Sequence, residues 1–211
     1  MEDKIKRFEE LLLSTKREGI DRLLEFIRKS DFYTAPASTR FHSCHEGGLL
    51  EHSLNVYDCL VAKRENPIWK EHLNDIGDDS LILSSLLHDL CKAYLYDTEL
   101  KNQKTYDKNK VEAADPKQVK KDNNGFFIWE TVPKYKIEDK IPLGHGSKSV
   151  ILAERYIKLS WSELFSINWH MGWSVPKEEY TALGNAFAKY PLAIALHEAD
   201  QEATYLLEKE E

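Results

Sequence analysis

The chain has 211 residues and a formal net charge of −7, and 31% of its residues are charged. This length is sufficient for a full hydrophobic core in one domain, 1–211. The negative charge argues against a broad basic surface that binds extended nucleic acid. Three cysteines without a CxxC pair indicate neither a disulfide framework nor a thiolate zinc site. Because we find no signal-peptide core and no run near the roughly 20 apolar residues of a membrane span, we expect a soluble, cytoplasmic protein.

The first 30 residues predict two N-terminal helices, because apolar side chains recur at helical spacing on both sides of Gly19. A loop is expected over 31–46, followed by a helix over 49–63. His52 shares an apolar stripe of this helix with Val56, so we expect its side chain to point inward.

A His-Asp doublet, His88 and Asp89, lies in one of the most apolar runs of the sequence. The run from Leu81 to Lys92 predicts a helix that is buried on most sides. A buried imidazole and a buried carboxylate carry a heavy desolvation cost unless they are paired or bind a metal ion. Side chains of neighbouring residues on a helix point in directions about 100° apart, so we expect that His88 and Asp89 cannot both point directly at one ion.

Residues 97–141 predict a loop and hairpin insertion. The first part, 97–125, is polar and is interpreted as an exposed excursion. The second part has two short aromatic and β-branched runs, and we expect a small hairpin that turns at Val132 and Pro133.

Helices are expected again after this insertion. Periodic apolar residues resume at Ser147, and Ser160 with Glu163 matches the capping-box pattern that begins a helix. Pro191 lies where a last helix would begin. The predicted fold class is therefore all-α, a helical bundle with a small β-hairpin insertion.

Six polar residues are embedded in or beside the predicted helices. Taken singly, such a residue is more often a hydrogen-bonded core residue or half of an ion pair than a ligand. Together, imidazole and carboxylate groups suit zinc, iron, manganese or nickel. The six are His52, His88, Asp89, His145, His170 and Asp200.

The order of these six residues resembles the HD-domain metal-dependent phosphohydrolase superfamily, in the form with two extra histidines before the last aspartate. The segments Gly47–Ser53 and Leu86–Lys92 are similar to the motifs of that family, and the resemblance covers about residues 40–205. Many members have glycine where this chain has Cys91. The resemblance implies an HD-type helical bundle in which His52, His88, Asp89 and Asp200 hold one metal ion, His145 and His170 hold a second, and Asp89 bridges the two.

By this resemblance the chain would be a hydrolase, either a phosphohydrolase or a phosphodiesterase, acting on a nucleotide or another small phosphorylated compound. Two adjacent cations polarise a phosphoryl group and convert the water between them to a hydroxide nucleophile. One or two divalent ions are expected, and the ligands leave iron, manganese, zinc, nickel and magnesium open. Asp89 and Lys92 are the catalytic candidates, since Lys92 could neutralise charge on the phosphate. A solvated lysine near a helix end is the alternative interpretation.

Arg40, His45 and Lys148 are candidates for binding the substrate phosphate, Lys148 because a helix begins beside it. The alternatives are a surface histidine and ordinary exposed cations. Two other functions stay open: a di-iron oxygenase resembling inositol oxygenase, and a non-catalytic sensor that binds metal or nucleotide. No membrane partner is expected. The substrate, the oligomeric state and a lid role for 97–141 are left open.

Overall fold

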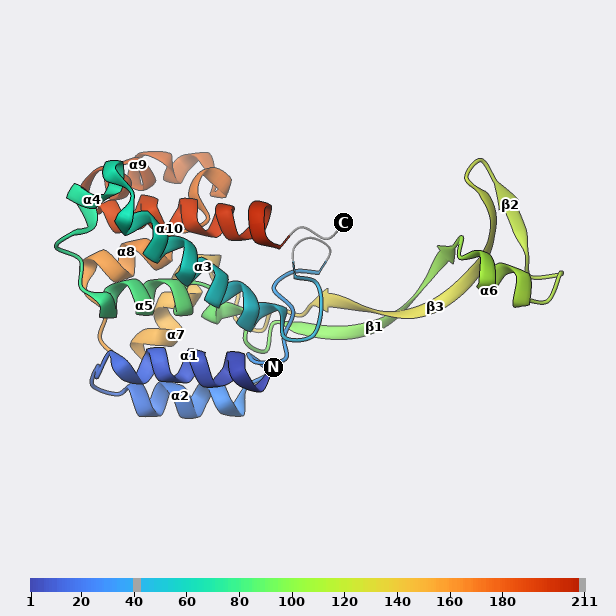
Figure 1. Cartoon of the computed structure of the whole chain (residues 1–211), viewed down its shortest axis with the longest axis horizontal. Coiled ribbons are helices and arrows are strands. Elements are labelled where there is room, and N and C mark those ends of the chain that lie inside the picture. The colour runs from blue at the N-terminus through green and yellow to red at the C-terminus, as the bar shows by residue number, and fades with distance from the viewer. Residues whose placement is uncertain (40–42, 209–211) are drawn as a thin grey trace. The chain divides into compact units, whose positions relative to one another are not determined.

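The computed structural model describes residues 1–39 and 43–208 (Figure 1). They form two compact units: residues 1–96 with the described residues from 139 onward, and residues 97–138. None of the helices within the described ranges is long and apolar enough to cross a membrane. The structure is mostly helical with a small sheet, so the predicted combination of a helical fold and a small β insertion is confirmed at this level.

The helical unit is built from α-helices joined by short turns of 3₁₀- or π-helix. Its elements are α1 (Glu2–Ser14), α2 (Ile20–Lys29), α3 (Gly48–Glu65), α4 (Pro67–Leu73), α5 (Asp78–Leu87), η1 (Leu90–Lys92), α7 (His145–Glu154), α8 (Trp161–Trp169), η2 (Gly172–Ser174), η3 (Lys177–Glu179), α9 (Tyr180–Lys189), α10 (Pro191–Glu202) and η4 (Ala203–Leu207). The predicted capping box begins α8, because Ser160 and Glu163 each accept a hydrogen bond from the other's backbone N–H.

Helix α5 is central to the helical unit. Every residue from Leu81 to Leu87 is buried, so α5 has no solvent face after its first turn, which begins with the exposed Asp78. One apolar cluster packs α5 against α1, α2, α3, α7 and α8. A second cluster joins α3 and α5 to α4 and α10. The segments that carry the six candidate ligands are therefore held against one another by the core.

The prediction that the His-Asp doublet lies inside a helix is wrong. Helix α5 ends at Leu87, and Asp89 has φ −105° and ψ 20°, outside the helical region. The Cys91 N–H would donate to the Leu87 carbonyl in a continuing helix, but it donates to Ser149 Oγ of α7 at 3.0 Å. This bond replaces the helical one, and the side chains of His88 and Asp89 then approach each other.

The small unit contains a three-stranded sheet in the order β1-β3-β2 and one short helix. Its elements are β1 (Tyr96–Thr105), α6 (Lys108–Ala113), β2 (Lys120–Asp122) and β3 (Gly125–Ile137). Strands β2 and β3 are antiparallel, with Lys120 opposite Phe127 and Asp122 opposite Gly125.

The predicted turn at Val132 and Pro133 is therefore wrong, because both residues lie within β3. The pairing with β2 stops at Phe127, so Pro133, which has no N–H to donate, lies where β3 is flanked by β1 alone. The turn lies instead between β2 and β3, before Gly125, which has φ 122°. The expectation of a loop over 97–125 is wrong as well, because this segment contains β1, α6 and β2.

Candidate metal centre

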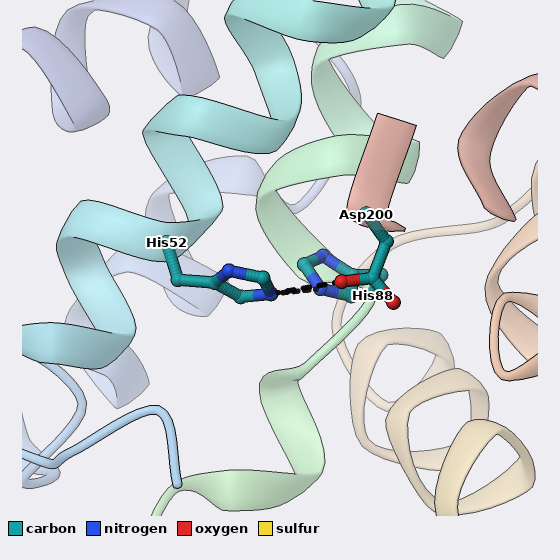
Figure 2. A group of neighbouring side chains, drawn as sticks. All are labelled: His52, His88 and Asp200. Atoms are coloured by element: carbon teal, nitrogen blue, oxygen red, sulfur yellow. Dashed lines mark hydrogen bonds and ion pairs between the residues drawn. The ribbon is translucent and has the colours of Figure 1, made fainter. Parts of the chain in front are cut away.

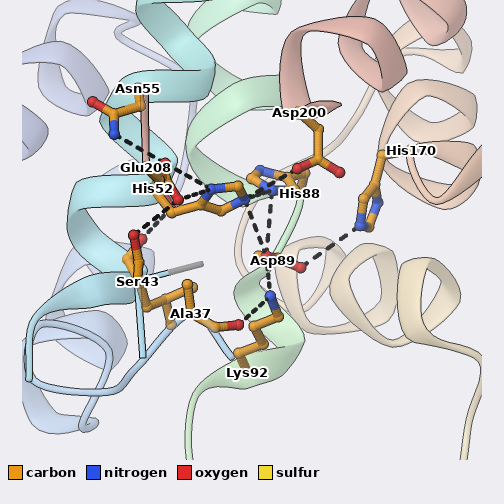
Figure 3. A network of polar contacts seen from close by, with 12 residues as sticks. Ala37, Ser43, His52, Asn55, His88, Asp89, Lys92, His170, Asp200 and Glu208 are labelled. Atoms are coloured by element: carbon orange, nitrogen blue, oxygen red, sulfur yellow. Dashed lines mark hydrogen bonds and ion pairs between the residues drawn. The ribbon is translucent and has the colours of Figure 1, made fainter. Parts of the chain in front are cut away.

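The six candidate ligands come from five segments of the chain and converge within the helical unit, and Figures 2 and 3 show five of them, all except His145. His52 belongs to α3, the doublet follows α5, His145 begins α7, His170 follows α8, and Asp200 lies in α10. All but His145 are buried, with at most 8% of any residue exposed. The His145 side chain is 31% exposed, so the cluster reaches solvent at this residue.

Two of the imidazoles are oriented by backbone carbonyls. His88 Nδ1 donates to the Ser85 carbonyl at 2.7 Å, and His170 Nδ1 donates to the Ile167 carbonyl at 2.7 Å. Because a carbonyl oxygen only accepts, each Nδ1 carries the proton and each Nε2 of a neutral ring keeps its lone pair. Both Nε2 atoms lie near Asp89, His88 at 3.4 Å from Oδ2 and His170 at 3.6 Å from Oδ1.

His52 lies between two carboxylates. Its Nε2 is 3.2 Å from Asp200 Oδ1 and 3.3 Å from His88 Nε2 (Figure 2). Its Nδ1 is 3.0 Å from Glu208 Oε1. Burial by itself would lower the pKa of His52, but the hydrogen bonds to Asp200 and Glu208 outweigh burial and raise this pKa to about 9. The carboxylates thus favour a positive charge at this position.

Glu208 is a site residue that the sequence did not indicate. Its carboxylate also accepts hydrogen bonds from Asn55 Nδ2 at 2.9 Å and from Ser43 Oγ at 2.8 Å (Figure 3). Burial would raise the pKa of Glu208, but its hydrogen bond to His52 leads the contacts that lower it. A carboxylate on the far nitrogen of an imidazole is the usual support of a metal-binding histidine.

Asp89 is the centre of the cluster, and its two oxygens face different partners. Oδ1 is 2.6 Å from His145 Nε2, on the same side as His170, whereas Oδ2 faces His88 and lies 3.7 Å from His52 Nε2. Burial would raise the pKa of Asp89, but the charge of Lys92 and the neighbouring imidazoles outweigh burial and hold this pKa well below its usual value. Asp89 is therefore an ionised carboxylate that contacts both halves of the cluster.

Lys92 is not a solvated lysine. Its Nζ is 2.6 Å from Asp89 Oδ2 and donates to the Ala37 carbonyl at 2.6 Å, and its side chain is 11% exposed. Burial would lower the pKa of Lys92, but the charge of Asp89 outweighs burial and raises it above the usual value. The cation is therefore fixed beside one oxygen of the central carboxylate.

The residues predicted to bind phosphate are less closely tied to the cluster. Lys148 is 5% exposed and its Nζ lies 2.5 Å from Asp139 Oδ1, so a phosphate would have to compete with this carboxylate. His45 is exposed, and its Nδ1 lies 3.1 Å from the Glu46 carbonyl. Arg40 lies outside the described residues.

Cys91 lies beside the cluster, with Sγ 3.3 Å from His145 Nδ1 and 3.5 Å from His145 Nε2. Burial is the main cause that raises the pKa of the Cys91 thiol to about 12. His197 Nδ1 donates to the His170 carbonyl at 2.7 Å and thereby holds the backbone of that candidate ligand.

The residues of the cluster fit a divalent metal ion. Within the described part of the chain, three overlapping groups have ligand atoms within 4.8 Å of one another: His52, His88 and Asp200; His88, Asp89 and His170; and Asp89, Cys91 and His145. His170 is 1% exposed, and its Nε2 has no hydrogen-bond partner among the residues described. An unpaired buried lone pair is costly, and a metal ion would satisfy it. Nitrogen and carboxylate donors suit the borderline divalent metals.

A short segment of the chain is similar to a protein of known activity. Over 62 residues the chain is 36% identical to a dihydroneopterin 2',3'-cyclic phosphate phosphodiesterase of Methanocaldococcus jannaschii. This segment is 29% of the chain and 24% of the relative, so the match leaves most of both proteins unaligned. No protein-family model matches the chain, and no solved structure matches it.

Proposed function

We propose that the protein is a metal-dependent phosphodiesterase of the HD type that acts on a small phosphorylated compound, with a 2',3'-cyclic phosphate as the first substrate class to test. The observation that carries this proposal is the arrangement around Asp89. The two oxygens of its ionised carboxylate face different sets of imidazoles. The similar phosphodiesterase acts, by its name, on a cyclic phosphate of a small molecule, which favours phosphodiester hydrolysis over the oxygenase alternative.

In this proposal, His52, His88 and Asp200 hold one divalent ion, His145 and His170 hold a second, and Asp89 contributes to both. Bound ions of this kind polarise a phosphoryl group and lower the pKa of water, so that hydroxide is available near neutral pH. The protein supplies the orientation of the ligands. The Ser85 and Ile167 carbonyls fix the protonation of two imidazoles, and Glu208 does the same for His52.

Lys92 has two roles in this proposal. In the free protein it keeps Asp89 ionised and holds Oδ2 at 2.6 Å. The Lys92 ammonium group lies beside the carboxylate at the centre of the proposed metal site. It would therefore also balance negative charge on a phosphoryl oxygen of a phosphodiester bound there. His145 is the more exposed ligand, so we place the approach of the substrate on its side of the cluster.

The test is a metal titration coupled to a substrate screen. Protein stripped with a chelator would be loaded separately with manganese, iron, zinc, nickel and magnesium. Each form would be assayed with 2',3'-cyclic nucleotides, dihydroneopterin 2',3'-cyclic phosphate and phosphate monoesters. We expect metal-dependent opening of a cyclic phosphate, and we expect Asp89→Ala to lose bound metal and hydrolysis together.

Asp58→Ala is the matched control, because Asp58 is a half-exposed carboxylate on the surface of α3 that pairs with Arg7. It should keep both metal and activity. Hydrolysis that survives complete removal of metal, or full activity in Asp89→Ala, would contradict the proposal. Oxygen consumption by the iron-loaded protein in place of hydrolysis would favour the oxygenase alternative instead.

A further inference from the structure

The small unit, residues 97–138, buries almost none of its own side chains. Phe127 is the one buried residue in this stretch, all of which the structure describes. Most of the unit is a ribbon of two long strands, β1 with 10 residues and β3 with 13 (Figure 1). A ribbon of this kind is at best marginally stable in water unless one of its faces is covered. The unit would therefore gain stability from a partner that covers one face.

Contacts between β1 and β3 show which side chains share a face of the ribbon. Thr131 Oγ1 donates to Asn102 Oδ1 at 2.7 Å, so these two side chains lie on one face. Lys136 Nζ lies 3.3 Å from Asp97 Oδ2 on the other face. Successive side chains of a strand point to opposite faces, so the remaining members follow by alternation. The face that contains Asn102, which we call the ribbon face, consists of Thr98, Leu100, Asn102 and Lys104 of β1 and Trp129, Thr131, Pro133, Tyr135 and Ile137 of β3.

The ribbon face is apolar and open to solvent. Leu100 is 73% exposed, Trp129 51% and Ile137 62%. Lys104 is its one charged residue, and Lys104 Nζ lies 2.5 Å from Asp122 Oδ2, which neutralises it. The opposite face of the same two strands is charged, with Asp97, Glu99, Lys101, Glu130, Lys134 and Lys136. The ribbon is therefore amphipathic, and its apolar side is the uncovered one.

We propose that the ribbon face is a self-association surface, on which the ribbons of two copies of this chain pack face to face about a two-fold axis. Such an isologous contact uses the same residues on both copies. Two sheets that pack in this way lie about 10 Å apart with their inner side chains interdigitated. Leu100, Trp129 and Ile137 would then leave water together, and the two ribbons would form a small sandwich.

The charges of the ribbon face favour a second copy over other partners. Two copies place no uncompensated like charges against each other, because Lys104 is paired within each chain. A nucleic acid or an acidic protein would instead require cations that are not already paired. The net charge of −7 makes two copies repel at long range, and salt screens this repulsion. Added salt should therefore strengthen the dimer, whereas it weakens the binding of nucleic acid.

The size of the ribbon face predicts a reversible dimer. With 10 residues in β1, about 3.3 Å per residue and a width of about 10 Å for two strands, the face covers about 300 Å². A contact between two such faces is at the low end of specific protein interfaces. We therefore expect a dissociation constant in the micromolar range.

The experiment is sedimentation equilibrium of the full-length chain over a dilution series from about 1 mM to 1 µM, at low and at high salt. The wild type should change from dimer to monomer within this range, and high salt should preserve the dimer to lower concentration. Leu100→Glu buries a carboxylate in the apolar contact and removes its water. This variant should raise the dissociation constant at least about tenfold.

Two control variants make the same change in charge outside the ribbon face. Gln103→Glu lies on β1 but on the opposite face of the ribbon, and Ile68→Glu replaces an apolar residue of α4 that is 77% exposed. Both should dimerise like the wild type. Amide hydrogen exchange is a second measurement. The amides of 97–138 should exchange more slowly as the wild type is concentrated, and Leu100→Glu should not show this protection.

Three results would overturn the proposal. The first is a wild type that stays monomeric up to about 1 mM. The second is a dimer that weakens equally in Leu100→Glu and Ile68→Glu. The third is a monomeric wild type whose ribbon face binds a single-stranded oligonucleotide, with binding lost in Leu100→Glu. If circular dichroism shows that Leu100→Glu fails to fold, the wild-type dilution series and its hydrogen exchange decide. Self-association does not depend on the metal centre, so this proposal and the proposed function can fail separately.

Discussion

Replacing Glu208 by alanine should weaken metal binding at His52 although Glu208 is not itself a proposed ligand. The Glu208 carboxylate accepts a hydrogen bond from His52 Nδ1 at 3.0 Å, which leaves Nε2, the nitrogen that faces Asp200 and His88, as the one that would bind a metal ion. In the Glu208→Ala variant this hydrogen-bond acceptor is lost, so the His52 ring can rotate or carry its proton on the other nitrogen. Removal of such a supporting partner typically costs 10- to 100-fold in metal affinity, which corresponds to about 1.4–2.7 kcal/mol.

The assay is a competition between the protein and a chelator of known affinity, with bound metal measured at each step. Glu208→Gln should lose less affinity than Glu208→Ala, because the amide oxygen can still accept from His52. Glu202→Ala is the control: Glu202 is a nearby half-exposed carboxylate that pairs with Lys63, and Lys63 retains Glu198 as a partner. Equal metal affinity in Glu208→Ala and the wild type would refute the reasoning.

Three further predictions concern stability and the placement of the ligands. Arg17→Ala should destabilise the fold by about 3–5 kcal/mol in urea denaturation, because it leaves the fully buried Glu163 without its cation; a loss below about 1 kcal/mol would contradict this. Burial would raise the pKa of Glu163, but the hydrogen bond from Arg17 leads the contacts that lower it below 4.5. This carboxylate therefore contributes stability above its unfolded pKa and loses it as the pH falls through the folded pKa. Unfolding free energies measured into the acid range should fall less steeply in Glu163→Gln, and parallel curves would argue against the assignment. Finally, Gly146→Ala would place a Cβ 2.1 Å from the Asn168 carbonyl oxygen and push α7 from α8, so metal content and melting temperature should both drop. Gly184→Ala, with no atom within 4 Å of its Cβ, should leave metal content unchanged and keep or raise the melting temperature.

The sequence predicted the main parts of the helical unit because the relevant signals are local. Apolar spacing places His52 on the inward side of its helix, and the capping box at Ser160 marks the start of α8. The order of imidazoles and carboxylates indicated a common site before any distance was known. The structure brings those six residues together in one cluster with Asp89 at its centre, and their role as ligands stays a prediction.

Glu208 escaped detection because nothing local distinguishes it. It lies in a charged segment at the end of α10 and η4, where a carboxylate usually faces water. Its partners are 153 and 156 residues away along the chain, at Asn55 and His52. The strands of the insertion were missed for a similar reason: β1 is largely polar, and its pairing with β3 is a tertiary contact rather than a local pattern.

The end of α5 shows how one tertiary contact determines the chemistry of the site. Continued helix would separate the directions of His88 and Asp89 by about 100°, and the sequence there contains neither glycine nor proline to stop it. Ser149 Oγ takes the Cys91 N–H, the chain leaves the helix at Asp89, and the carboxylate turns toward both His88 and His145. Because Ser149 lies in the helix that begins with His145, α7 carries one proposed ligand and also shapes the doublet. In addition to the apolar core, one hydrogen bond therefore ties the doublet to the helix that carries His145, and the doublet motif alone could not indicate this geometry.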